Sequence, residues 1–407
     1  METVVMKFGG PSIATPEKIK DVAARVVAQQ QKGKHVVVVM SSMPTIRRDL
    51  RDYAARLSDE PSKREMDVLL ATGAQMTSAL LVIAIEELGA RAVSLTGQQA
   101  GIKTDTTHRN ARIEEVDTAR MKTHLTAGEI VVVAGFQGVT EANDITTLGK
   151  GGSETTAVAI AAALETPVEI YTTVDGIYTA DPQVVDHARK LKELSYDEML
   201  ELANLGAHIL HPRAVELAKK FNVPIVVRSS SEEVEGTIVK GDVEMEKNLV
   251  VRGVAYEADI IRLTIGYDSY ETASLAEVFS ILAEQGINVD IIVQAVIDRV
   301  KPTISFTIAK EEFAEALRVL EGSKLALGFS FADFEVGLAK VSIVGSGMVS
   351  NPGVAARMFA RLGKEHIPVK MVSTSEIKVS VVVPQEEMVR AANILHEEFQ
   401  LAEIITA

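Results

Sequence analysis

The chain has 407 residues, of which 47% are apolar and 24% charged, with a net charge of −14 and no cysteine. This length predicts two or three domains rather than one hydrophobic core. The lack of cysteine excludes disulfides, thiolate metal sites and a cysteine nucleophile, and the acidic balance argues against a nucleic-acid partner. No continuous apolar run approaches the roughly 18 residues of a membrane span. No export signal is visible, so we expect a cytoplasmic protein without a membrane partner.

The first 230 residues alternate short β-branched runs with longer helical stretches. This alternation is typical of an α/β domain with a largely parallel, buried sheet. The expected strands include residues 4–6, 36–40, 92–95, 130–134, 169–171 and 224–227. The expected helices include residues 16–31, 65–88 and 155–164.

An internal repeat follows, because residues 275–289 match residues 355–369 at an offset of 80. Each copy reads strand, helix, strand, strand, helix, and units this small bury little surface alone, so we expect them to pair. A polar, acidic stretch at residues 229–235 indicates a linker. We therefore predict an α/β domain at 1–230, a linker at 231–248, and two small domains at 249–335 and 336–407.

The first candidate site is the turn after the opening strand, where Lys7 is followed closely by Gly9 and Gly10. Two glycines let the backbone approach a ligand closely, and the ammonium and the backbone N–H groups favour an anion. The alternative interpretation is a tight turn with a surface lysine.

The second candidate is a glycine-rich loop at residues 147–156, which contains Lys150 and runs directly into an expected buried helix. Free amides at a helix N-terminus attract anions. Alternatively, Ser153 or Thr155 only caps the helix. Three glycines and a lysine before the cap are more than capping needs, so we favour an anion site.

The third candidate covers residues 171–182, where a strand runs into a turn-rich segment with Asp175 and Asp181. Ligands of open parallel sheets lie beyond the carboxyl ends of the strands. The alternative is that both aspartates are ordinary turn residues.

Together these motifs resemble the aspartate kinase family of the amino-acid kinase fold. The matching segments are residues 7–12, 69–73, 135–138, 147–156, 178–182 and 211–214, in the family's order. The repeat resembles the family's tandem ACT domains. The resemblance implies an α/β amino-acid kinase fold, with a largely parallel sheet in three αβα layers, followed by two ferredoxin-like βαββαβ ACT domains.

The resemblance also implies an activity: ATP- and Mg²⁺-dependent phosphorylation of the side-chain carboxylate of aspartate, which begins lysine, threonine and methionine biosynthesis. It implies allosteric regulation by an amino acid such as lysine or threonine. A homodimer or higher homo-oligomer through the ACT domains is expected.

Roles for individual residues follow from the same resemblance. Lys7 and Lys150 would be catalytic. The nucleotide-binding positions would be Lys7, Gly9, Gly10, Ser12, Thr172, Thr173, Tyr178, Asp181 and His208. The substrate-binding positions would be Ser41, Thr45, Ala74, Lys150, Ser153 and Glu154. The effector-binding positions would be Asp268, Asn288, Val289, Asp290 and Gln294. No protein ligand to a metal is implied.

Several of these positions depart from the family's pattern. Pro11 replaces a threonine and so removes a hydroxyl and a backbone N–H. Ala74 replaces the glutamate that holds the substrate's α-ammonium, and Lys150 and Glu154 replace an arginine and an aspartate. On the nucleotide side, Thr173, Gln183 and His208 replace an aspartate, an arginine and a lysine. Three interpretations therefore stay open: an aspartate kinase, a kinase for a small carboxylate without a free amine, and a non-catalytic nucleotide- or effector-binding homologue.

Overall fold

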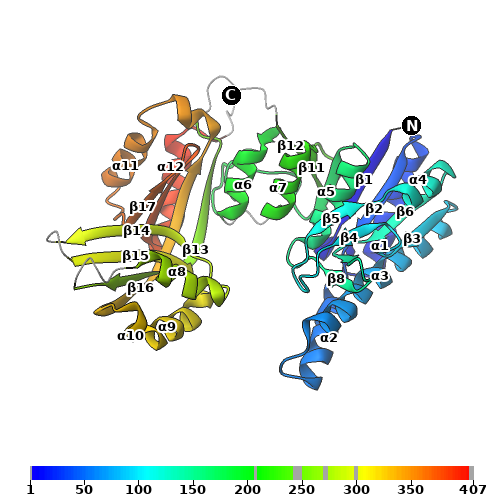
Figure 1. The fold of residues 1–407 in the computed structure, drawn as a ribbon. Coiled ribbons are helices and arrows are strands. Elements are labelled where there is room, and N and C mark those ends of the chain that lie inside the picture. Colours follow the sequence, from blue (N-terminus) through cyan, green and yellow to red (C-terminus); the bar gives the residue numbers. More distant parts are fainter. Residues whose placement is uncertain (1, 206–208, 242–249, 269–273, 298–300, 403–407) are drawn as a thin grey trace, which may run out of the picture. The chain divides into compact units, whose positions relative to one another are not determined.

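The computed structural model describes residues 2–205, 209–241, 250–268, 274–297 and 301–402 (Figure 1). The chain folds into two compact units. Unit 1 comprises Met1–Ile177, Lys190–Asn204 and His208–Met245, and unit 2 comprises Tyr178–Arg189, Leu205–Ala207 and Glu246–Ala407. Each is described by itself.

Unit 1 is built on an eight-stranded sheet. Its strands are β1 (Thr3–Phe8), β2 (His35–Met40), β3 (Ala92–Leu95), β6 (Ile130–Ala134), β9 (Val168–Thr172), β10 (Glu193–Ser195), β11 (Ile225–Ser229) and β12 (Thr237–Lys240). Their order is β10-β12-β11-β9-β1-β2-β6-β3. Every neighbouring pair is parallel except β11 and β12. The largely parallel sheet is therefore confirmed.

Helices cover both faces of this sheet (Figure 1). They are α1 (Pro16–Gln31), α3 (Lys63–Glu87), α4 (Ala119–Thr126), α5 (Gly152–Ala163), α6 (Tyr196–Asn204) and α7 (Pro212–Phe221). Helix α2 (Pro44–Leu57) packs on α3 and projects away from the sheet. Because successive strand residues point to opposite faces, Met6 and Phe8 pack in one core with residues of α1 and α3. Lys7 points to the other face, where it meets α5.

A second, four-stranded sheet lies in unit 1. It contains β4 (Ile102–Thr104), β5 (Ile113–Val116), β7 (Gln137–Val139) and β8 (Ile145–Thr147), in the order β5-β4-β7-β8. Strand β8 ends where the glycine-rich loop begins. This sheet therefore fixes the start of the second candidate site.

Helix α3 is long and apolar enough to cross a membrane by length and composition alone. Its buried positions include Asp67, Leu70, Ala71, Ala74, Thr77, Ser78, Leu81 and Ile85. They recur at three- and four-residue spacing, which is the stripe of a helix that packs on a core. Leu81 and Ile85 lie in the same cluster as β1 and β2. We therefore interpret α3 as a core helix.

The linker predicted at residues 231–248 begins too early. Residues 237–240 form β12, which pairs with β10 and β11 inside the main sheet. Thr237 is fully buried and donates its hydroxyl to Leu191 O at 2.6 Å. The acidic residues that suggested a linker precede this strand, and residues 242–249 lie outside the described residues.

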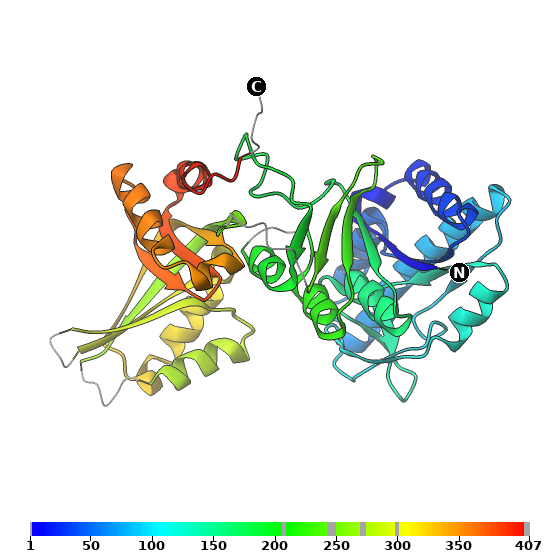
Figure 2. The same ribbon diagram turned by 90° about the horizontal axis from the view of Figure 1, so that it is seen from above.

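Unit 2 contains a six-stranded antiparallel sheet. Its strands are β13 (Gly253–Gly266), β14 (Asp290–Ile297), β15 (Lys301–Ala309), β16 (Phe331–Val344), β17 (Met371–Thr374) and β18 (Lys378–Pro384), in the order β14-β15-β13-β16-β18-β17. Its helices are α8 (Leu275–Glu284), α9 (Phe313–Gly322), α10 (Lys324–Leu327), α11 (Val354–Lys364) and α12 (Met388–Glu398). In Figure 2, colour separates the yellow-green and yellow helices of the first repeat from the orange and red helices of the second.

The two repeats share the long strands β13 and β16. Leu263 and Ile265 of β13 pack in the first core, whereas Val254 packs with Val341 in the second. Val251, just before β13, also belongs to the second core. The predicted ranges place Val251 and Val254 in the first small domain. The sequence repeat could not reveal this arrangement. The first part of β13 precedes the first repeat in the chain but packs in the core of the second repeat.

Residues 178–189 also belong to unit 2, although the predicted α/β domain included them. Ala180 and Val185 pack in the second core with α11 and α12. The N–H of Val254 donates to Thr179 O at 2.7 Å, and the side chain of Asn393 donates to Val184 O at 3.0 Å. The second part of the third candidate motif, residues 178–182, is therefore held by unit 2.

A buried histidine secures this segment. Thr179 Oγ1 lies 2.9 Å from His396 Nε2 and accepts the N–H of Arg189 at 2.9 Å. Thr179 is fully buried and His396 is 3% exposed. Burial, with a smaller contribution from His187 and Arg189, lowers the pKa of His396 to about 4. The imidazole is therefore neutral at neutral pH.

We expect unit 2 to lose stability as the pH falls from 6.5 to 4. Between the ordinary pKa of 6.5 and the folded-state pKa of about 4, the unfolded chain binds the extra proton, so the free energy of unfolding falls with the pH. The whole shift corresponds to about 3 kcal/mol. Urea denaturation at pH 7 and pH 4.5 should show a smaller pH dependence for His396→Gln than for the wild type. An equal dependence in both proteins would contradict this assignment.

Candidate active site

A buried ion pair joins β1 to α5. Lys7 Nζ lies 3.1 Å from Glu154 Oε1, and the two side chains are 11% and 16% exposed. The other oxygen, Glu154 Oε2, accepts the N–H of His211 at 2.8 Å. One carboxylate thus connects the end of a central strand, the first turn of α5 and the residue that precedes α7.

Close packing explains the first glycine of the turn after β1. A Cβ at Gly9 would lie 2.6 Å from Ser41 Oγ and 3.2 Å from Lys7 Nζ. Ser41 directly follows β2, so the carboxyl ends of two neighbouring parallel strands bring Lys7, Gly9 and Ser41 together. Gly10 has a φ of 57°, which favours glycine.

A hydroxyl without a partner lies in the same turn. Ser12 is 6% exposed, and its Oγ has no hydrogen-bond partner among the described residues. A buried polar atom of this kind requires a satisfying group, such as a ligand or water. Together with the buried ammonium of Lys7, this atom favours an anion cradle over a surface bend.

The glycine-rich loop enters α5 without a side-chain cap. Gly149 and Gly151 have φ values of 77° and 71°, and Gly151 is the N-cap residue. Thr155 donates its hydroxyl back to Gly151 O at 3.1 Å instead of capping. The capping interpretation is therefore wrong, and the positive end of the helix dipole is available to an anion.

Ser153 and Lys150 occupy different surroundings in this loop. Ser153 is 8% exposed, and a Cβ at Gly135 would lie 3.1 Å from Ser153 Cβ, so Ser153 lies beside the end of β6. Lys150 is exposed. Burial lowers the pKa of His211; the Glu154 carboxylate opposes this effect, and the positive charge of Lys150 adds to it.

The remaining substrate positions lie on the two helices after β2. Thr45 is exposed in the first turn of α2, and Ala74 is 1% exposed on α3. A Cβ at Gly73 would lie 2.5 Å from Ser42 Oγ, so this turn of α3 abuts the residue next to Ser41. Both positions are near the end of β2, and their contact with a substrate stays a prediction.

The nucleotide positions fall in both units. In unit 1, Thr172 is the last residue of β9 and Thr173 follows it. Thr172 O accepts the N–H of Ser230 at 2.8 Å, and Thr173 is exposed. Tyr178 and Asp181 belong to unit 2. His208 lies outside the described residues.

Asp181 already has partners in unit 2. Its Oδ2 accepts the Tyr256 hydroxyl at 2.9 Å, and its Oδ1 accepts the N–H of Gln183 at 2.9 Å. Burial, together with this bond to Asp181, raises the pKa of Tyr256 to about 12. Gln183, where the family has an arginine, therefore keeps its main-chain contact with Asp181, while its side chain is exposed.

The effector positions lie in unit 2: Asn288 and Val289 precede β14, Asp290 and Gln294 lie in β14, and Asp268 follows β13. Asp268 and Gln294 are exposed, Val289 is half-buried, and the N–H of Asn288 donates to Glu312 at 3.2 Å. Residues 269–273 of the expected effector loop lie outside the described residues. The effector roles stay predictions.

Asp290 forms an ion pair that the sequence did not indicate. It contacts Lys340 of β16, which is 4% exposed and lies 2.7 Å from Glu257 as well. Burial opposes the charged forms of both partners, but the Lys340 ammonium outweighs it and lowers the pKa of Asp290. The carboxylate of Asp290 thus balances a buried lysine.

Sequence reasoning missed several residues that shape the site. Arg213 donates to Leu148 O at 2.6 Å and so holds the glycine-rich loop. Phe136 has a φ of 73°, and its N–H donates to the Thr156 hydroxyl at 3.1 Å. These residues fall in motifs that were noted at residues 135–138 and 211–214 but received no role.

The fit to a divalent cation is limited. No group of three or more histidine, aspartate or glutamate side chains that could hold a metal ion exists among the described residues. Glu154, the acid beside Lys7, is already paired. Mg²⁺ commonly binds through one or two carboxylates and the substrate phosphates. The described side chains therefore supply no complete metal site of their own.

The arrangement as a whole suits an anionic reacting group. A buried ammonium, an unpartnered hydroxyl and a helix N-terminus converge on the carboxyl ends of β1, β2 and β6. Phosphoryl transfer requires from a protein mainly positioning and stabilisation of negative charge. The site contains the groups for that task.

Two family models match the chain, one in each half. Residues 2–229 match the model described as the amino acid kinase family. Residues 273–323 and 341–399 match the model of an ACT domain.

The chain is also similar to named proteins over its full length. It is 54% identical to an aspartokinase of Geobacillus stearothermophilus over 405 residues, which is 99% of this chain and 98% of the relative. It is 54% identical to aspartokinase 2 of Bacillus subtilis over 403 residues, again 99% and 98% of the two chains.

A solved structure shares the fold. E. coli aspartokinase III, in complex with aspartate and ADP, has a TM-score of 0.78 at 25% identity and covers 98% of this chain and 99% of its own. A complex of the same E. coli protein with lysine and aspartate also has a TM-score of 0.78 at 25% identity, and covers 98% of this chain and all of its own. The expected fold is confirmed by these matches.

Proposed function

Because the chain belongs to the aspartokinase family, we propose that it transfers the γ-phosphoryl group of ATP to the side-chain carboxylate of aspartate. The observation that carries this proposal is the buried Lys7–Glu154 pair, 3.1 Å apart at the carboxyl edge of the sheet. It fixes a positive charge where phosphates and a carboxylate would meet.

Lys7 has the central role in this proposal. Its ammonium neutralises charge shared by the transferring phosphoryl group and the acceptor carboxylate. Gly9 keeps the space beside Lys7 open, and the Ser12 hydroxyl, which lacks a described partner, donates to a phosphate oxygen. Ser41 lies on the acceptor side, at the end of β2.

The loop before α5 binds the aspartate substrate in this proposal. Lys150 attracts its carboxylates, and Ser153 contributes a hydroxyl beside β6. Glu154 holds Lys7 and is itself held by His211. Ala74 supplies no charge for the substrate's ammonium.

ATP is the phosphoryl donor, and we propose that Mg²⁺ arrives as its phosphate complex and neutralises phosphate charge. The described residues provide no cluster of three ligands, which is consistent with a metal held mainly by the nucleotide. No residue of this chain is assigned to it.

Regulation and assembly complete the proposal. We propose that an amino-acid effector such as lysine or threonine binds unit 2, since the E. coli relative has been solved with lysine. The edge strand β14 exposes Ile292 and Val293, so we also propose a homodimer or higher homo-oligomer through the ACT domains. We expect the protein in the cytoplasm, as its lack of cysteine suggests.

ADP release from ATP and Mg²⁺ tests the substrate, with aspartate, succinate and glutamate offered separately. We expect aspartate to give the highest kcat/KM. Succinate lacks the amine, so a higher kcat/KM for succinate would contradict the assignment and favour a carboxylate without a free amine. No ADP release with any of them would favour a non-catalytic homologue.

A further inference from the structure

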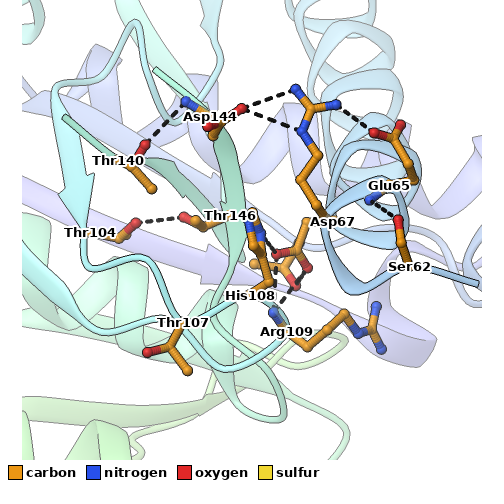
Figure 3. A network of polar contacts seen from close by, with 12 residues as sticks. Ser62, Glu65, Asp67, Thr104, Thr107, His108, Arg109, Thr140, Asp144 and Thr146 are labelled. Atoms are coloured by element: carbon orange, nitrogen blue, oxygen red, sulfur yellow. Dashed lines mark hydrogen bonds and ion pairs between the residues drawn. The ribbon is translucent and has the colours of Figure 1, made fainter. Parts of the chain in front are cut away.

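A buried carboxylate on α3 has no role in the site described above. Asp67 is fully buried. Its Oδ2 lies 2.8 Å from His108 Nδ1 and accepts the N–H of Arg109 at 3.0 Å (Figure 3). Its Oδ1 accepts the hydroxyl of Thr147. Charge buried in this way is costly unless hydrogen bonds satisfy it. An aspartate buried with this many partners therefore calls for a structural reason.

These partners are the first residue of the glycine-rich loop and the chain packed beside it. Thr147 is the last residue of β8 and is fully buried. Arg109 has a φ of 73°, and a Cβ at Gly149 would lie only 3.0 Å from Arg109 O. Asp67 therefore fixes both the entry of the loop and the backbone against which Gly149 packs.

A second side chain holds the loop from another direction. Arg213 donates to Leu148 O at 2.6 Å and also to Ala111 O, and Ala111 in turn donates its N–H to Thr147 O at 3.0 Å. With its first two residues held, the loop passes through Gly151 into α5.

We infer that Asp67 is a positioning residue: through Thr147 and Arg109 it sets the glycine loop, and with it the aspartate-binding side chains Lys150, Ser153 and Glu154. The kinetic test of this inference rests on the proposed function, because it measures aspartate phosphorylation. Asp67 itself contacts the loop entry and not the Lys7–Glu154 pair. Its effect should fall on aspartate more than on ATP.

The test replaces Asp67 by asparagine, which keeps the size but loses one acceptor oxygen. Misplacing a binding loop by about 1 Å can cost up to about a hundredfold. We expect Asp67→Asn to raise the KM for aspartate at least about tenfold while the KM for ATP changes less than about threefold. Thr147→Val should have a similar effect, Thr147→Ser should restore most of the loss, and the double variant should be no worse than about the larger single one.

Asp144 supplies the matched control. It lies in the same region (Figure 3) and pairs with Arg64 at 3.0 Å, but both side chains are exposed. Asp144→Asn should keep wild-type kinetics. An unchanged KM for aspartate in Asp67→Asn would overturn the inference, and so would multiplicative losses in the double variant or equal increases in both KM values.

Hydrogen exchange separates this inference from the proposed function. Amides of residues 147–152 should exchange at least about tenfold faster in Asp67→Asn than in Asp144→Asn, with or without substrate. Unchanged protection of the loop would overturn the positioning role even if the enzyme is active. A wild-type protein that releases no ADP with aspartate would overturn the proposed function, while the exchange result would still decide the role of Asp67.

Discussion

Replacing Lys7 by alanine is expected to lower kcat for aspartate phosphorylation at least about a thousandfold. The ammonium is the buried positive charge at the junction of β1, β2 and α5. Removing one preorganised group that stabilises transition-state charge typically costs a hundred- to a thousandfold, and here Glu154 would also lose its partner. Steady-state kinetics at saturating ATP and aspartate measure the effect.

Lys34→Ala provides the comparison for Lys7→Ala. Lys34 also pairs with a glutamate, Glu2, at 3.2 Å, but it lies before β2, at the opposite edge of the sheet, and Glu2 is exposed. Exposed pairs contribute roughly 0–1 kcal/mol, so we expect near wild-type kinetics. If Lys7→Ala kept more than about a tenth of the wild-type kcat, Lys7 would not be catalytic.

Gly151→Ala is expected to lower kcat/KM for aspartate at least about a hundredfold. The new Cβ would lie 2.2 Å from Cγ of His211, so that ring must move. His211 donates its N–H to Glu154, and its displacement would disturb the Lys7–Glu154 pair. The φ of 71° adds about 1–2 kcal/mol of backbone strain. Kinetics and the thermal unfolding midpoint together measure the effect.

Gly33→Ala separates the effect of backbone strain from the effect of a steric clash. Gly33 has a φ of 81°, but a Cβ there meets nothing within 4 Å. The Gly33→Ala protein should lose about as much stability from backbone strain as Gly151→Ala does, and it should keep wild-type kinetics. Equal kinetic losses in both variants would show that the loop before α5 has no special role.

Much of the fold could be predicted from hydrophobic patterning. Residues 16–31, 92–95 and 130–134 have the expected bounds as α1, β3 and β6. In each, a clear apolar period or run ends at turn-forming or polar residues. Strand β12 was missed because its four residues follow an acidic stretch, and only pairing with β10 and β11 stabilises it as a strand.

The site was partly predictable for a different reason. Glycine and lysine after a strand, and glycines before a buried helix, are local signals, and both motifs reach one edge of the sheet. The Lys7–Glu154 contact spans 147 residues, so no local pattern could indicate it. The role of Asp67 could not be predicted either, because a single aspartate in a helix usually faces solvent.

The packing of residues 178–189 shows a further limit of sequence patterns. Asp181 reads as a turn residue in the segment after β9, yet it bonds to Tyr256 of unit 2. Thr179 of the same segment contacts His396. Side chains from far along the chain complete these contacts. The turn chemistry was correct, but it contained no information about the core on which the segment packs.

Trapping of the acyl phosphate tests the central claim most directly. An aspartyl phosphate reacts with hydroxylamine to give a hydroxamate, which iron(III) detects by colour. Incubation with ATP, Mg²⁺, aspartate and hydroxylamine should yield one hydroxamate per ADP released, and the Lys7→Ala protein should yield almost none. Equal hydroxamate from both proteins, or ADP release by the wild type without hydroxamate, would contradict phosphorylation of the aspartate carboxylate at this site.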